Sequence, residues 1–129
     1  MEDYKKVVGN LLHISNLIKV YHWQTLLYAR HKATDDLYSD FNSLTDRFVE
    51  ALNGNLIRIN QNNRISVNDY NITLIDISDN KGVSILKITI ELLKSDLFTT
   101  VIGNNADLMT IRDEMLELIN KNYYLFTMK

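Results

Sequence analysis

Four side chains between residues 31 and 50 are of the types that bind metal ions: His31, Asp35, Asp46 and Glu50. They are spaced four, eleven and four residues apart. At about 100° per residue, a helix places them at roughly 0°, 40°, 60° and 100°, so they share one stripe. The apolar residues of the segment lie at roughly 220–300° on the same helix and are Leu37, Phe41, Leu44, Phe48 and Leu52. The stripe is therefore expected to point away from the helix's own core face.

The spacing of this stripe is symmetric about a point midway between residues 40 and 41. If two copies of the helix met antiparallel across a two-fold axis at that point, His31 would face the partner's Glu50, and Asp35 the partner's Asp46. Such an isologous contact pairs the same surface with itself. Each dimer would hold two identical clusters of one imidazole and three carboxylates, about 22 Å apart along the helix. The pattern indicates a metal site shared between copies.

The competing interpretation is a polar face without metal, because Asp and Glu usually lie at the surface. As a metal-free dimer face it would bring Asp35 against Asp46, and two facing carboxylates repel or share a proton.

The composition limits the chemistry of any site. A chain of 129 residues is expected to form one domain. It contains no cysteine, which excludes disulfides, thiolate metal sites and thiol catalysis. A metal site must then use imidazole and oxygen ligands, which suit iron, manganese or zinc.

Charge and hydropathy indicate a cytoplasmic protein that does not enter a membrane. No run of about 20 apolar residues is present, and the first residues lack a signal-peptide pattern. The formal net charge is −2 and no block of Lys and Arg appears. DNA binding is not expected, because it relies on neutralising many phosphates.

The apolar periodicity predicts an all-α fold with helices at about 3–24, 29–53, 80–102 and 105–125. A break near 24–28 is required because the apolar stripes of the first two helices are out of phase on one continuous helix. Gly54 is expected to end the second helix. Ser78 or Asp79 is expected to cap the third, and Asn104 or Asn105 the fourth.

The connection 54–79 is Asn-rich and contains short alternating runs at 65–67 and 72–78. It is expected to be irregular, and local preference slightly favours a strand over 72–77. Short first and last links with one long crossover between the second and third helices predict a ferritin-like four-helix bundle.

Three motifs resemble the ferroxidase motif of Dps, the miniature ferritins called DNA-binding proteins from starved cells. They are Tyr21-His22-Trp23, His31-x3-Asp35 and Asp46-x3-Glu50. The sequence HWQT…YARHKA is also similar to sequences in uncharacterised ferritin-like proteins of phages and large DNA viruses. The step from His22 to His31 is three residues shorter than in Dps, and the basic N-terminal tail of some members is absent.

The resemblance implies that His22, His31 and Asp35 of one subunit bind iron together with Asp46 and Glu50 of its partner. It implies a di-iron site at a two-fold interface, with Mn or Zn as other metals, and Trp23 near it to intercept oxidising intermediates. It further implies a homo-oligomer, up to a 12-subunit shell, and a role in iron storage and oxidative stress.

Two functions follow as hypotheses. The first is an iron-binding ferroxidase that uses hydrogen peroxide or dioxygen. The alternative is a non-catalytic ferritin-like structural or interaction module, such as a viral component in a host cell or virion.

Overall fold

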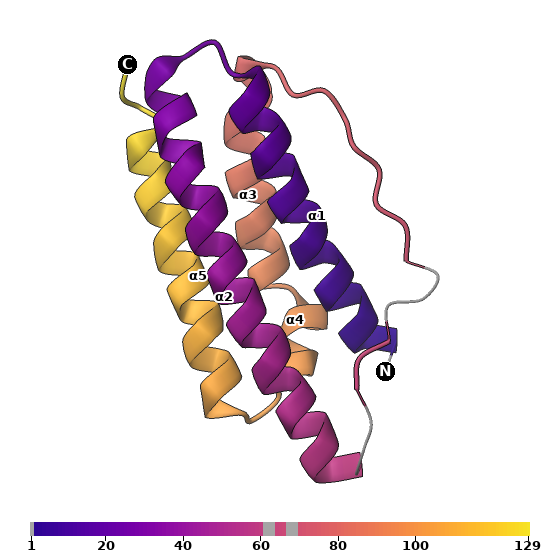
Figure 1. Ribbon diagram of the computed structural model, residues 1–129. Coiled ribbons are helices and arrows are strands. Elements are labelled where there is room, and N and C mark those ends of the chain that lie inside the picture. Colours follow the sequence, from indigo (N-terminus) through magenta and orange to yellow (C-terminus); the bar gives the residue numbers. More distant parts are fainter. Residues whose placement is uncertain (1, 61–63, 67–69) are drawn as a thin grey trace.

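The computed structural model of the chain describes residues 2–60, 64–66 and 70–129. These residues form helices and contain no strand (Figure 1). The helices are α1 (Glu2–Gln24), α2 (Tyr28–Asn60), the 3-10 helix η1 (Asp79–Lys81), α3 (Gly82–Leu93), α4 (Asp96–Ile102) and α5 (Ala106–Leu125). The expected all-α class is confirmed.

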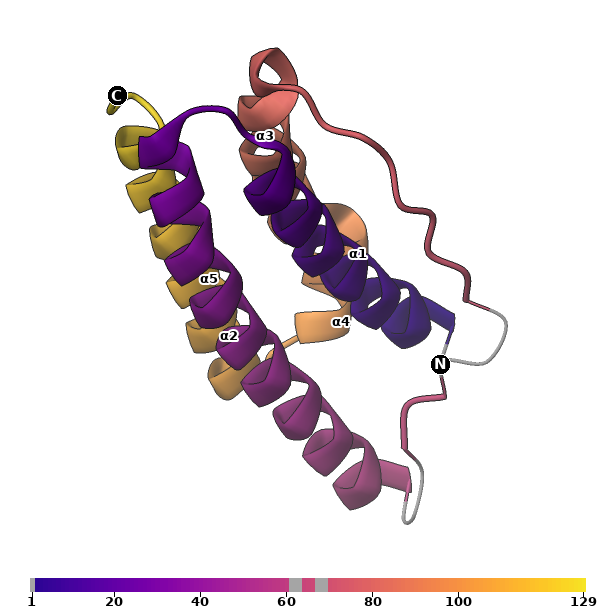
Figure 2. The same ribbon diagram turned by 45° about the horizontal axis from the view of Figure 1, so that its top comes forward.

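The long helices lie side by side as a bundle (Figures 1 and 2). In Figure 1, α1 runs upward, α2 downward, α3 and α4 downward, and α5 upward. The main contacts join α1 to α2, α2 to α5, α5 to α3 and α3 to α1, while α4 packs on α1. Helices α1 and α5 therefore lie on one diagonal of the bundle, and α2 and α3 on the other. Within the described ranges, no helix is both long and apolar enough to cross a bilayer.

The expected core face of α2 is buried. Leu37, Phe41, Phe48 and Leu52 are at most 2 % exposed, and Leu44 is partly buried against them. The ring of Phe48 lies 5.1 Å from that of Phe98 in α4. Burial of this face stabilises the fold by removing several large apolar side chains from water, and it directs the opposite face of α2 outward.

One predicted helix end is wrong, and one predicted helix is divided into two. Helix α2 continues past Gly54 to Asn60, because Leu56, only 2 % exposed, extends the buried row one turn beyond Leu52. The predicted third helix is divided at Lys94 and Ser95. There the Ser95 hydroxyl accepts a hydrogen bond from the Phe98 backbone N–H at 3.2 Å and starts α4 as its N-cap.

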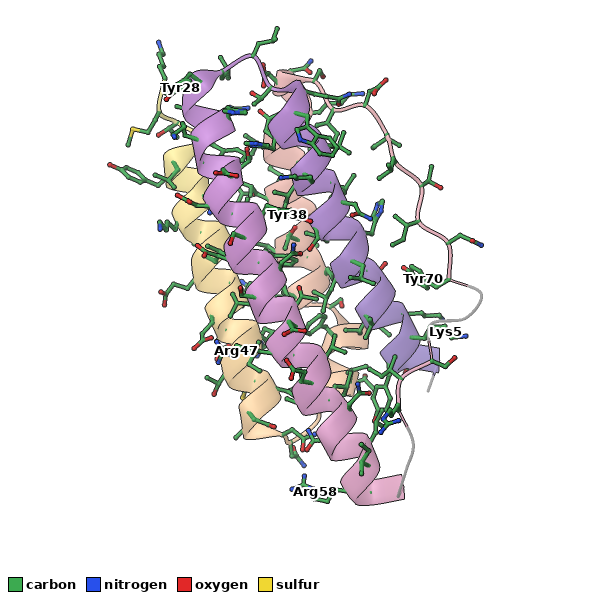
Figure 3. The ribbon with its side chains drawn as sticks, in the orientation of Figure 1. Lys5, Tyr28, Tyr38, Arg47, Arg58 and Tyr70 are labelled. Atoms are coloured by element: carbon green, nitrogen blue, oxygen red, sulfur yellow. The ribbon has the colours of Figure 1, made fainter. Side chains whose placement is uncertain are left out.

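Residues 70–78 of the crossover lie beside α1 (Figures 1 and 2) and are irregular. The preference for a strand over 72–77 is wrong because the backbone bonds to α1 side chains instead of a neighbouring strand. The backbone N–H of Ile77 donates to Gln24 Oε1 at 2.7 Å. The side chain of Tyr70 (labelled in Figure 3) also holds the crossover to α1, because its hydroxyl donates to Asn10 Oδ1 at 2.7 Å. The predicted run at 65–67 extends outside the described residues.

The residues expected to cap the third helix have other roles. Lys81 occupies the N-cap position of α3, and Ser78 that of η1. Asp79 instead accepts hydrogen bonds from the Tyr21 hydroxyl at 2.9 Å, the Thr25 hydroxyl and the Leu26 backbone N–H at 3.0 Å. At the fourth helix Asn105 occupies the N-cap position of α5, but its side chain makes no capping hydrogen bond and donates to the Ile102 carbonyl oxygen instead.

The Asp79 carboxylate thus joins the end of the crossover to the linker between α1 and α2. Partial burial raises the pKa of Asp79, but hydrogen bonds from Thr25, Leu26 and Tyr21, together with the Arg30 charge, leave that pKa below its usual value. Arg30 also donates to the Asp79 carbonyl oxygen at 2.9 Å and to the Tyr21 hydroxyl at 2.8 Å.

The substitution Asp79→Ala is expected to lower the free energy of unfolding at pH 7 by about 1 kcal/mol, because three donors lose their acceptor. A lowered native pKa stabilises the fold above the ordinary value of 3.8 and ceases to do so as the pH falls through the native value. Urea unfolding at several pH values should therefore show the difference from wild type shrinking below pH about 4. A difference that is unchanged in acid would contradict the role of the carboxylate, and Asp113→Ala serves as the exposed control.

Candidate metal centre

His22 and His31 come from different helices and lie against each other. His22 is in the last turn of α1 and 8 % exposed, whereas His31 is in the first turns of α2 and exposed. Their rings stack with centroids 4.1 Å apart and planes 15° apart. The short linker 25–27 turns the chain back so that the two imidazoles meet.

The hydrogen bonds of both imidazoles determine which ring nitrogen carries the proton. The Thr34 hydroxyl donates to the Arg30 carbonyl at 2.7 Å, so its oxygen accepts from Nδ1 of His22 at 3.0 Å. Nδ1 of His31 lies 3.0 Å from the His22 carbonyl oxygen, which can only accept. Each neutral ring therefore carries its proton on Nδ1.

The Nε2 atoms of His22 and His31 have no hydrogen-bond partner among the described residues. Each neutral ring thus offers one lone pair at Nε2 while its Nδ1–H is held by the protein. Metal-binding histidines commonly show this arrangement, in which the second nitrogen donates to an oxygen that sets the tautomer and the ring orientation. The two rings form what we call the imidazole half-site.

Asp46 and Glu50 form a second pair, one turn apart on the exposed face of α2. A hydrogen bond with Asp46, the negative charge of Asp46 and slight burial, in that order, raise the pKa of Glu50. Neither carboxylate forms an ion pair with any described residue. This carboxylate half-site is therefore a pair of uncompensated acids that a cation would stabilise.

The structure does not join the predicted ligands within one chain. Asp35 is exposed and lies at the edge of a pocket of about 270 Å³ shared with the end of α5. In the described part of the chain, no three His, Asp or Glu side chains are close enough to hold one metal ion. One chain thus provides two separated half-sites.

Trp23 and Lys19 lie beside the imidazole half-site on α1. Trp23 is 68 % exposed, and the Lys19 ammonium lies 5.7 Å from its ring centroid. The same ammonium lies 4.7 Å from the ring centroid of Tyr38, which α2 directs toward α1 (Figure 3).

The sequence reasoning did not identify Thr34, Lys19 or Tyr38 as part of this region. Thr34 is part of this region because it contacts His22. That contact depends on how α1 packs against α2, so no local sequence pattern predicts it.

Comparison with known proteins gives one family match. The model described as "Family of unknown function (DUF5856)" matches residues 22–126, a range that contains His22 and every other predicted site residue. No curated protein and no solved structure matches the chain.

The hydrogen bonds predict that both histidines, when neutral, are Nδ1-protonated tautomers. A two-dimensional ¹H–¹⁵N spectrum of the imidazoles should show this pattern for His22 and His31 in metal-free protein. Thr34→Val removes the acceptor of His22 and should return that ring to a mixture of tautomers, while His31 keeps its pattern. An Nε2-protonated His22 in the wild type would contradict the assignment.

Proposed function

We propose that this chain, which belongs to the DUF5856 family, binds and oxidises Fe(II) in the manner of the Dps-like miniature ferritins that residues 21–50 resemble. The observation that carries this proposal is the pair of stacked imidazoles whose Nδ1–H groups are held by the protein and whose Nε2 lone pairs are available. Neutral imidazole nitrogens together with carboxylates suit iron, and also manganese or zinc.

The separation of the imidazoles supports a dinuclear site. Metal ions in two-metal sites are about 3.5–4 Å apart. Parallel rings 4.1 Å apart fit one imidazole on each of two ions better than two imidazoles on a single ion. Carboxylates from elsewhere would then complete and bridge the pair.

The missing ligands are proposed to come from a partner copy. Each chain has an imidazole half-site, with His22 on α1 and His31 on α2, and a carboxylate half-site on α2. His31 and Glu50 lie at symmetric positions of α2, and among the described residues neither half-site contains three ligands. A two-fold axis near residues 40 and 41 would bring His22, His31 and Asp35 against the partner's Asp46 and Glu50. The uncompensated charge of Asp46 and Glu50 supports this pairing.

The up, down, down, up course of the helices, with the long crossover between α2 and α3, is what a ferritin-like four-helix bundle requires. It supports that fold, and with it a homo-oligomer built from two-fold dimers, up to a 12-subunit shell.

In the proposed reaction each of two bound Fe(II) ions loses one electron. Hydrogen peroxide takes these two electrons and two protons and becomes two waters. Dioxygen, the other oxidant, takes two electrons and two protons and becomes hydrogen peroxide. The chain's own residues hold the substrate. Thr34 and the His22 carbonyl orient the imidazoles, and Asp46 and Glu50 supply the negative charge that favours Fe(III) over Fe(II). Trp23 beside His22 is proposed to intercept oxidising intermediates.

The first experiment measures aerobic Fe(II) oxidation by the absorbance of the ferric product. Wild type should oxidise Fe(II) well above the rate in buffer, and Asp46→Ala/Glu50→Ala should reduce the rate to the buffer level. Asp113→Ala/Glu117→Ala removes an equally spaced, exposed carboxylate pair from α5 and should keep the wild-type rate. Equal slow rates in all three proteins would refute the ferroxidase.

A mixing experiment tests whether the site is shared. His31→Ala and Asp46→Ala/Glu50→Ala should each be inactive alone. After unfolding and joint refolding, random pairing makes half of the dimers mixed, and each mixed dimer has one intact site. About a quarter of the wild-type activity should return. A mixture that stays inactive, although both variants still dimerise, would contradict a site built from two chains.

A further inference from the structure

We propose that the Trp23 indole of each copy occupies a groove on its partner, at the junction of α1 and α2 beside the carboxylate half-site. The groove is lined by Val8, Leu12, Asn42, Thr45, Asp46 and Val49. This inference rests on the two-fold dimer of the proposed function, but it does not require iron.

The groove has the size and chemistry to receive an aromatic side chain. Its volume is about 280 Å³, and its apolar wall includes Leu12, which is 42 % exposed. Thr45 also lines the groove, but its hydroxyl is buried inside the chain and has no hydrogen-bond partner among the described residues. The polar side chains of Asn42 and Asp46 line the groove as well, so it can receive a group that is mostly apolar and carries one donor.

Trp23 supplies a group of this kind. Its indole is 68 % exposed in the single chain, although an aromatic side chain of this size gains much from burial. Its N–H is a donor only and would bond to an acceptor of the polar lining. Trp23, Lys19 and Leu12 lie at intervals of four and seven residues along one outer stripe of α1, next to the stripe of α2 that carries the half-sites.

The packing register of α1 against α2 brings this indole to the groove. His22 contacts Thr34 and Lys19 contacts Tyr38, so Trp23 lies level with residues 33–34 of its own α2. A two-fold axis between residues 40 and 41 makes that level coincide with residues 47–48 of the partner. Side chains on a helix lean toward its N-terminus, which directs the indole of Trp23 toward the partner's Thr45.

Charge complementarity favours the same arrangement. Asp46 and Glu50 have no cation among the described residues, while Lys19 lies over the Trp23 ring. Seating Trp23 in the groove would carry the Lys19 ammonium toward the partner's Asp46. The indole would then form a wall of the shared site and exclude water from it.

Trp23 is the only tryptophan of the chain, so its fluorescence reports its position directly. In metal-free buffer with chelator, the emission maximum should move to shorter wavelength as the protein dimerises. Sedimentation measures the dimerisation in parallel. Leu12→Glu places a charge in the groove and should weaken the dimer at least about tenfold, with emission at the wavelength of an exposed indole. Met109→Glu, at a similarly exposed residue of α5, should behave as wild type.

A mixture of two variants tests whether the contact is made between copies. Trp23→Phe keeps the groove but emits no tryptophan signal, and Leu12→Glu keeps Trp23 but blocks its own groove. Adding excess Trp23→Phe to Leu12→Glu should move the remaining emission to shorter wavelength. Emission that stays at long wavelength, at concentrations where wild type is dimeric, would overturn the inference.

The outcomes separate this inference from the ferroxidase. Suppose that Trp23 is buried in wild type, that Leu12→Glu exposes it, and that wild type does not oxidise Fe(II). This result would support the groove contact and refute the ferroxidase. Fe(II) oxidation that depends on Asp46 and Glu50, in a dimer whose Trp23 remains exposed, would refute the groove contact alone. A wild-type chain that stays monomeric would refute both the groove contact and the site shared between two chains.

Discussion

The antiparallel packing of α1 against α2 is the constraint on which the rest of the structure depends. Large apolar side chains of both helices, including Ile18 and Tyr21 of α1 and Phe41 and Phe48 of α2, are buried in one core. Because the faces of a helix are rigidly related, burying one face determines where the others point. The same packing therefore brings His22 to His31, directs the polar stripe of α2 outward and leaves Trp23 on the surface.

The end of the bundle that carries the imidazoles is also the most heavily cross-linked by polar contacts. The Asp79 carboxylate binds the linker between α1 and α2. Arg30 joins Asp79 to the last turn of the chain by donating to the backbone carbonyls of Asp79 and Phe126. Both imidazoles are held by oxygens of this same region. If the two imidazoles bind metal ions as proposed, they lose little freedom on binding, which is the advantage of a preorganised site.

The opposite end of the same α2 face has several groups that are unfavourable in an isolated chain. The Asp46 carboxylate raises the pKa of Glu50, a buried hydroxyl lacks a partner among the described residues, and apolar groups border an open groove. The proposed interface between copies would bring imidazoles and a lysine toward the acids and an indole into the groove, and so would relieve the first and the third of these costs.

Periodicity alone determined much of this protein: the helical class, the turn near residues 24–28, the buried face of α2 and the outward stripe with its symmetric spacing. These depend on contacts between neighbours within a helix, which local sequence specifies. The helix ends were less predictable, because the burial of Leu56 outweighed Gly54 as a stop signal, and the Ser95 cap lies within an uninterrupted apolar pattern. Only the tertiary structure decided that His22 stacks on His31, that Thr34 holds its ring and that Asp79 binds the linker. Those contacts join residues on separate helices or loops, and their geometry depends on how the whole core packs.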